Sequence, residues 1–127
     1  MNATITNDAK TEVTIQFNSA LKRYATLKEK FVNRVNENPV QAVTWDAEEL
    51  VNAQAAYEIW MKVVATMDTK DALQAIEYGI GACEQLVESF FGHSHSDLYT
   101  TAVARTKATQ YSAMCRLLKD LHYRYSK

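Results

Sequence analysis

Two histidines and an aspartate occupy alternate positions, His93, His95 and Asp97, in a short polar segment. Imidazole and carboxylate groups are ordinary ligands of zinc and similar metals, and Glu88 lies one turn back in the preceding helical stretch, where it would complete a site. The segment also fits an exposed link between two helices, with Ser96 or Asp97 capping the second. We expect this link and no bound metal, because a fourth ligand is not assured.

The cofactor sites typical of helical bundles lack the residues that would build them. None of the three histidines follows a glutamate by three positions, as the ligands of di-iron carboxylate bundles do. The Cys-x-x-Cys-His motif that attaches a c-type haem is also absent from the sequence. We therefore expect a protein without a cofactor.

Arg116 and His122 are separated by five residues near the end of the chain. This pair resembles the Arg-x(4-6)-His signature of HEPN-type ribonucleases, and the resemblance implies that both side chains act on the scissile phosphate of RNA. Leu117 follows the arginine, where that family favours a polar residue. On a straight helix the two side chains lie about 120° apart. The competing interpretation is a surface arginine paired with Asp120 and a histidine near a helix end.

Basic residues gather on one sector of the last helical stretch, opposite its apolar residues. Cations interleaved with an aromatic ring can follow a phosphate backbone, so this sector is a candidate nucleic-acid surface. The other interpretation, which we expect, is a solvated helix face. The sector contains Arg105, Arg116, Lys119, Tyr123 and Lys127.

The elements that must position these residues are predicted from apolar spacing. Residues 11–38, 44–67, 68–92 and 96–127 carry apolar side chains at alternating spacings of three and four. Such spacing keeps an apolar stripe of each helix against a neighbour. Short links make consecutive helices antiparallel. The sequence therefore predicts an all-α, up-down-up-down four-helix bundle.

Residues 1–10 are rich in Thr, Asn and Asp, and we expect a flexible N-terminal lead there. The bundle domain is then formed by residues 11–127. Pro39 is expected to stop the first helix within residues 36–38, because the residue before a proline avoids the helical conformation.

Polar residues at the right spacing predict where the next two helices begin. Asp46 and Glu49 have the spacing of a capping box for the second helix. Asp68 or Thr69 is expected to cap the third helix.

Composition limits the functional classes that remain. A chain of 127 residues with a net charge of -1 is one domain, and it is not a strongly basic nucleic-acid protein. Its two cysteines, Cys83 and Cys115, are expected to be reduced thiols. No stretch of the sequence is apolar enough for a membrane span. We therefore expect a cytoplasmic protein with no membrane partner.

Charge is divided unequally among the predicted helices. Residues 11–38 carry five basic and three acidic groups, and residues 93–127 carry six and two. Residues 44–67 carry one basic and four acidic groups, and residues 68–92 carry one and five. If the first and last helices are neighbours, one side of the bundle is basic. Intramolecular pairing on solvated faces is the expected reason, and self-association or a polyanionic partner is the alternative.

The second and third helices carry more apolar surface than one stripe requires. A helix that is apolar on two faces is covered on both, either by the N-terminal lead or by another subunit. We expect the subunit, and therefore a homo-oligomer. The predicted interface contains Val51, Ala55, Ile59, Val63, Ala75, Tyr78, Gly79 and Ala82.

These observations predict a non-catalytic helical protein of the adaptor or inhibitor type. Its expected partners are a second copy of itself and another protein. The first alternative is a HEPN-like, metal-independent ribonuclease that uses Arg116 and His122. The second is a nucleic-acid-binding accessory subunit that uses the basic sector of the last helix.

Overall fold

The computed structural model describes the backbone of residues 3–92 and 98–126 and the side chains of residues 8–89 and 103–126. It is all-α, as predicted, and the described residues contain no strand. The long helices are α1 (Ala3–Glu37), α3 (Ala47–Thr66), α4 (Ala72–Gly92) and α5 (Leu98–Tyr125). A short helix, α2 (Pro39–Gln41), and one π-helical segment, η1 (Ala42–Asp46), connect α1 to α3.

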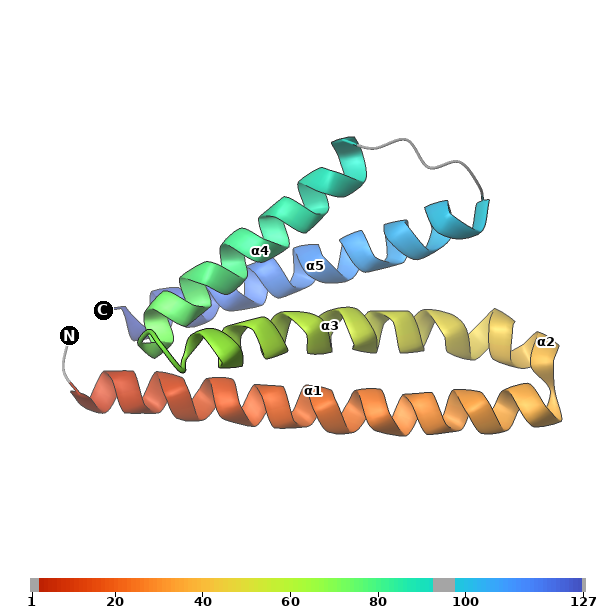
Figure 1. The fold of residues 1–127 in the computed structure, drawn as a ribbon, viewed down its shortest axis with the longest axis horizontal. Coiled ribbons are helices and arrows are strands. Elements are labelled where there is room, and N and C mark those ends of the chain that lie inside the picture. Colours follow the sequence, from red (N-terminus) through yellow and green to blue (C-terminus); the bar gives the residue numbers. More distant parts are fainter. Residues whose placement is uncertain (1–2, 93–97, 127) are drawn as a thin grey trace.

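The long helices alternate in direction along the chain, so the up-down-up-down order is confirmed (Figure 1). Helices α1 and α3 form a long antiparallel hairpin. Helix α5 packs on α3, and α4 packs on α5 and α3 before its C-terminal end diverges from the other helices (Figure 1). Helix α3 therefore contacts all three of the other long helices.

The first and last helices, α1 and α5, contact each other over only part of their length. In a regular bundle they would be neighbours throughout. Helix α1 packs mainly on α3, and α5 packs mainly on α4 and α3. Among the described residues, an ion pair between Arg124 and Glu12, at 3.4 Å, joins α5 to α1. The two basic helices therefore lie on opposite sides of α3 and do not form one continuous basic side.

The chain is helical from Ala3, where a flexible lead was expected. Ala9 and Val13 are fully buried, because they extend the apolar stripe of α1 towards its N-terminal end. Residues 3–10 therefore belong to the first helix of the bundle.

Capping differs from the sequence expectation at two helices. Helix α4 begins with a capping box between Asp71 and Gln74, in which each backbone N–H donates to the other side chain, at 3.2 and 2.8 Å. Asp68 and Thr69 instead belong to the turn before it. Asp46 caps no helix, because η1 leads into α3 without a break.

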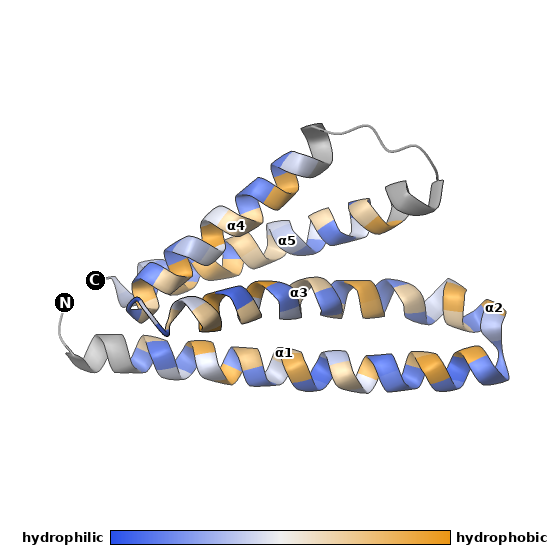
Figure 2. Ribbon diagram, viewed as in Figure 1, coloured by the Kyte–Doolittle hydropathy of each residue, from blue (hydrophilic) through white to orange (hydrophobic). Residues whose placement is uncertain are grey.

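Helix α3 is covered on two faces. On one face Tyr57 stacks with Phe17 and Tyr24 of α1, with ring centroids 5.9 and 5.4 Å apart. On the other face Ile59 and Val63 lie in the fully buried core beside residues of α4 and α5. Figure 2 shows apolar residues recurring along both α1 and α3. The second apolar face of α3 is therefore covered by the chain's own helices.

Gly79 of α4 is buried and faces side chains of both α3 and α5. A Cβ atom at this position would be 2.6 Å from Cγ2 of Val63 and 3.0 Å from Cδ1 of Leu118. Gly81, two residues later in the same helix, has no atom within 4 Å of such a Cβ.

We expect Gly79→Ala to lower the free energy of unfolding by about 1–3 kcal/mol, because the added methyl group must displace buried side chains. Gly81→Ala is the matched control, and it should raise that free energy by about 0.5–1 kcal/mol through helix propensity alone. Urea unfolding of both variants measures the difference. Equal stabilisation by the two alanines would contradict the close packing at Gly79.

Candidate functional site

Asp46 fixes the end of the α1–α3 hairpin. Its side chain is buried, Nε of Arg34 donates to its Oδ2 at 3.0 Å, and Nζ of Lys30 lies 3.9 Å from its Oδ1. Hydrogen bonds between two ionised groups are stronger than neutral ones. The carboxylate therefore holds η1 against the last turns of α1.

The end of this hairpin exposes three large apolar side chains, which we call the tip cluster. Val40 is 75% exposed, Val43 is 66% exposed and Trp45 is 71% exposed. The hairpin extends past the ends of α4 and α5, so neither helix covers the tip (Figure 1). Large apolar side chains left exposed within a few residues of one another indicate a candidate interaction site, and tryptophan contributes strongly to protein interfaces.

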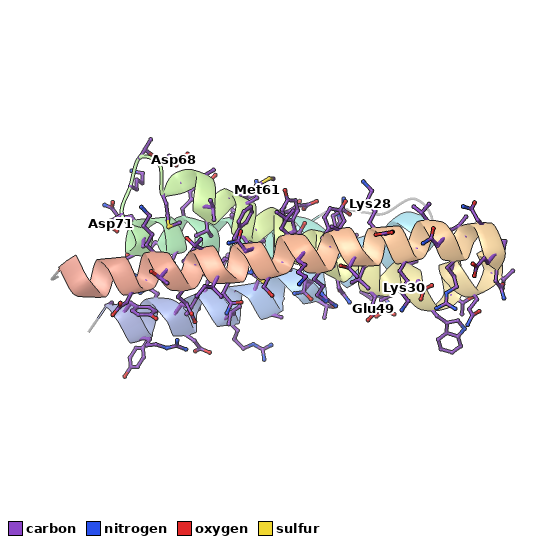
Figure 3. All side chains as sticks on the ribbon, turned by 90° about the horizontal axis from the view of Figure 1, so that it is seen from below. Lys28, Lys30, Glu49, Met61, Asp68 and Asp71 are labelled. Carbon is purple, nitrogen blue, oxygen red and sulfur yellow. The ribbon has the colours of Figure 1, made fainter. Side chains whose placement is uncertain are left out.

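Carboxylates border the tip cluster. Glu37 ends α1, and Glu48 and Glu49 stand in the first turn of α3; all three are exposed and take part in no ion pair among the described residues. Figure 3 shows Glu49 and Lys30 on the same side of the hairpin. The border of the tip is therefore more acidic than basic, since Lys30 and Arg34 are already paired with Asp46.

Sequence reasoning missed the tip cluster. The apolar spacing assigns residues 39–43 to a link between helices, where polar residues are usual, and assigns Trp45 to the start of the second helix. The available signal was the presence of Val40, Val43 and Trp45 within a segment that had no predicted helical neighbour to cover them.

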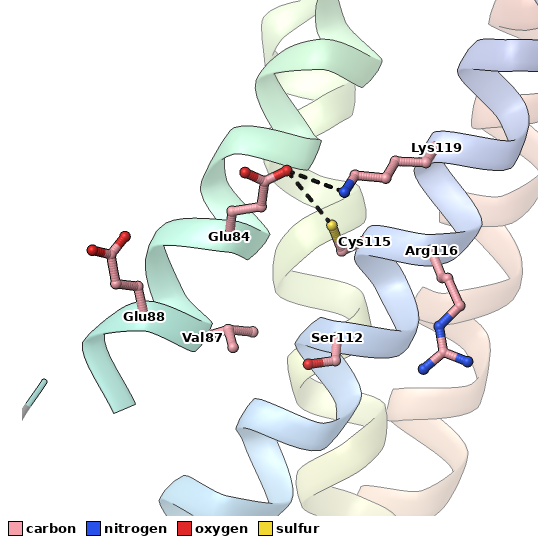
Figure 4. A pocket seen from close by; sticks show the side chains of 7 residues that line it. All are labelled: Glu84, Val87, Glu88, Ser112, Cys115, Arg116 and Lys119. Carbon is pink, nitrogen blue, oxygen red and sulfur yellow. Dashed lines mark hydrogen bonds and ion pairs between the residues drawn. The ribbon is translucent and has the colours of Figure 1, made fainter. Parts of the chain in front are cut away.

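A second candidate is the cleft between α4 and α5, which has a volume of about 390 Å³. Lys119 lies 3.4 Å from Glu84, and the Cys115 thiol donates to the same glutamate at 3.9 Å (Figure 4). Arg116 points away from this pair (Figure 4). The lining residues are Glu84, Val87, Glu88, Ser112, Cys115, Arg116 and Lys119.

The positive charge of Lys119 is stabilised by its neighbours in this cleft. The pKa of Lys119 is raised by the nearby Cys115 and by Glu84. Burial, followed by the proximity of Cys115 and Glu84, raises the pKa of the Cys83 thiol to about 12. The cleft therefore contains a lysine paired with Glu84 beside the Cys115 thiol, whereas the Cys83 thiol is buried outside its lining and stays neutral.

Arg116 and His122 have different neighbours in the fold. Nε2 of His122 lies 2.8 Å from Oε1 of Glu77 on α4, whereas Arg116 borders the cleft one and a half turns earlier. Asp120, the partner expected for Arg116, makes no ion pair with it. His122 thus contacts the Glu77 carboxylate of α4 and not Arg116.

The basic sector of α5 is partly neutralised. Lys119 pairs with Glu84, and the neighbouring Lys107 and Arg124 pair with Glu58 and Glu12. Such pairs reduce the charge available to a phosphate backbone. Within the sector, Arg105, Arg116 and Tyr123 are exposed, and Lys127 lies outside the described residues.

The residues predicted to form a subunit interface are mostly inside the chain. Ala55, Ile59, Val63, Ala75 and Gly79 are buried in the monomer, because α3 and α4 cover each other's second apolar face together with α5. These residues cannot reach a second subunit in this fold. Val51 and Ala82 are partly exposed, and Tyr78 is exposed.

The proposed metal ligands are mostly outside the described residues, because His93, His95 and Asp97 all fall within residues 93–97. Glu88 is described and lies at the rim of the α4–α5 cleft. In the described part of the chain, no group of three or more metal-ligating side chains gathers.

We expect iodoacetamide to modify Cys115 and to spare Cys83 in the native protein at pH 8. The thiolate is the nucleophile, and a buried thiol with a pKa of about 12 forms it rarely. Mass spectrometry after timed labelling checks this. The Cys115→Ser control should be unreactive until urea exposes Cys83; equal native labelling of both cysteines would contradict the packing.

We expect no RNA cleavage by the wild-type protein or by His122→Ala, because His122 pairs with Glu77 rather than Arg116. The measurement is cleavage of a labelled single-stranded RNA without added metal. Cleavage by the wild type that His122→Ala abolishes, with helicity retained, would instead establish the ribonuclease interpretation.

No protein-family model, curated protein or solved structure matches this chain. In the described ranges, no helix has the length and apolar character that crossing a bilayer requires.

Proposed function

We propose that this chain is a non-catalytic binding protein of the adaptor or inhibitor type that acts on another protein through the tip cluster. The observation that carries the proposal is the exposure of Val40, Val43 and Trp45 at one end of the α1–α3 hairpin. When a partner covers such side chains, the free energy of the complex falls by about 25 cal/mol per Å² of apolar surface removed from water.

The support under the tip suits a binding surface. The pairing of Asp46 with Arg34 and Lys30 holds η1 in one conformation, so a partner does not have to order this segment. A π-helical segment inside a helical region also frequently marks a functional site.

The charges near the tip cluster indicate what kind of partner surface would fit it. Glu37, Glu48 and Glu49 are exposed and flank the tip cluster in the sequence, which fits a partner surface with an apolar pocket and basic residues at its rim. A polyanion such as RNA is disfavoured at this site by like charge. No geometry among the described residues favours the ribonuclease or nucleic-acid alternatives.

The proposal includes two expectations carried from the sequence. The protein acts as a homo-oligomer, and it works in a reducing compartment such as the cytoplasm. The free thiols of Cys83 and Cys115 support the second expectation.

We expect Trp45→Ser to weaken partner binding by at least thirtyfold, which corresponds to about 2 kcal/mol for a central interface tryptophan. The wild type, Trp45→Ser and Tyr78→Ser are each incubated with native extract, and the co-purifying proteins and nucleic acids are identified. The affinity of the partner found in this way is then measured for each form of the protein. Tyr78→Ser is the control, because this tyrosine is also an exposed aromatic but lies on α4.

The tip proposal requires that binding be lost without loss of folding. Trp45 is 71% exposed, so its replacement should change the free energy of unfolding by only about 0.5 kcal/mol. A partner that binds all three forms equally, or that is recovered only as nucleic acid, would contradict the proposal.

A further inference from the structure

Helix α1 carries two apolar stripes that run side by side. The stripe that packs on α3 contains Ala20, Tyr24, Leu27 and Phe31 at alternating spacings of four and three. A second stripe follows it one residue later, about 100° further around the helix. We call this second stripe the α1 seam, and it contains Leu21, Ala25, Lys28, Val32 and Val35.

The α1 seam is exposed although most of it is apolar. Val32 is 52% exposed, Leu21 is 41% exposed, and Val35 is also exposed. Lys28 of the seam and the exposed Met61 of α3 lie on the same side of α1, and Lys30 lies on the opposite side (Figure 3). The seam therefore faces outward on one side of the hairpin, the side on which Met61 is also exposed.

Spacings of four and three residues are the repeat by which one helix packs along another in a coiled coil. We propose that the α1 seam binds the same seam of a second copy of this chain, in an antiparallel, two-fold symmetric dimer. The inference specifies the self-association included in the proposed function, and it does not depend on the tip cluster.

The apolar residues of the seam match one another in the antiparallel direction. When the two-fold axis passes between residues 26 and 27, Leu21 of each copy faces Val32 of the other. The same axis places Lys28 opposite Ala25 of the second copy. A small residue there leaves room for the aliphatic part of the lysine, whose ammonium group reaches solvent.

Charge selects the antiparallel direction. In a parallel pair with the same register, Lys28 would face Lys28 of the other copy across the seam, which is repulsive. In the antiparallel pair, Lys22 lies next to Glu29 of the second copy, and this contact occurs twice. Lys22 and Glu29 are exposed, and neither takes part in an ion pair among the described residues.

Self-complementarity indicates that the occupant is a second copy. A two-fold interface requires one patch to match itself after rotation, and residues 21–32 of the seam do so, while Val35 lies beyond this matched stretch. The seam spans about 21 Å of helix, a small area for a stable dimer, so a micromolar dissociation constant is expected.

The test is sedimentation of the full chain at about 1 to 200 µM, a range that brackets the expected micromolar dissociation constant. The wild type should shift from monomer to dimer across this range. Val32→Glu should raise the dissociation constant more than tenfold while helicity is retained, because Val32 is half exposed. Val43→Glu is the control, since it adds the same charge at the tip and should leave the dimer intact.

The direction of the dimer is tested by exchanging charges. Lys22→Glu and Glu29→Lys should each weaken the dimer, and the double variant should restore it, because only the antiparallel register places these two residues together. Lys28→Leu should tighten the dimer by removing the charge from the seam.

Three results would overturn the inference. They are a monomeric wild type at the highest concentration, a dimer that Val43→Glu disrupts but Val32→Glu does not, and a double variant that fails to restore association. The tip proposal is judged separately, since partner binding by Trp45→Ser is independent of sedimentation by Val32→Glu.

Discussion

The arrangement of the bundle depends on the need to cover α3 on two faces. Tyr57 requires a neighbour on one side, and Ile59 and Val63 require neighbours on the other. Helix α1 covers the first face, and α4 and α5 cover the second. The close approach of α4 is possible because Gly79 has no side chain where Val63 and Leu118 meet it. A regular square bundle would leave part of α3 exposed, so the helices pack around it unequally.

The charges of the helices agree with this arrangement. In the packing order α1, α3, α5 and α4, basic and acidic helices alternate, and most of the ion pairs between elements join one kind to the other. Lys107 pairs with Glu58 of α3, and Lys119 pairs with Glu84 of α4. Exposed pairs of this kind contribute only about 0.2–1 kcal/mol each. Their main effect is to pair Lys107, Lys119 and Arg124 of the basic α5 with carboxylates of the other helices.

Apolar periodicity was sufficient for the fold and insufficient for the surface. The spacing of three and four residues predicted the long helices because any buried helix must present a continuous stripe. It could not distinguish a face covered by the same chain from one covered by another, and this is why Ile59 and Val63 were expected at a subunit interface. Asp46 was expected as a cap for a related reason, since local spacing does not reveal that Arg34, twelve residues earlier, lies beside it. Trp45 was missed because no sequence pattern states where a hairpin will extend past its neighbours.

The surfaces that remain without a covering element are therefore more informative than the core. Removing Val40, Val43 and Trp45 from the hairpin end would cost the isolated chain little stability, because these side chains contact solvent more than protein. The same holds for Leu21 and Val32 on the outer side of α1, next to a stripe that is buried. In both places the backbone is already held, by Asp46 at the hairpin end and by α3 along α1. Apolar residues there add little stability to the monomer, which is why we propose contacts that form only in a complex. The two proposals therefore use separate surfaces, the outer side of α1 for a second copy and the end of the hairpin for a different partner.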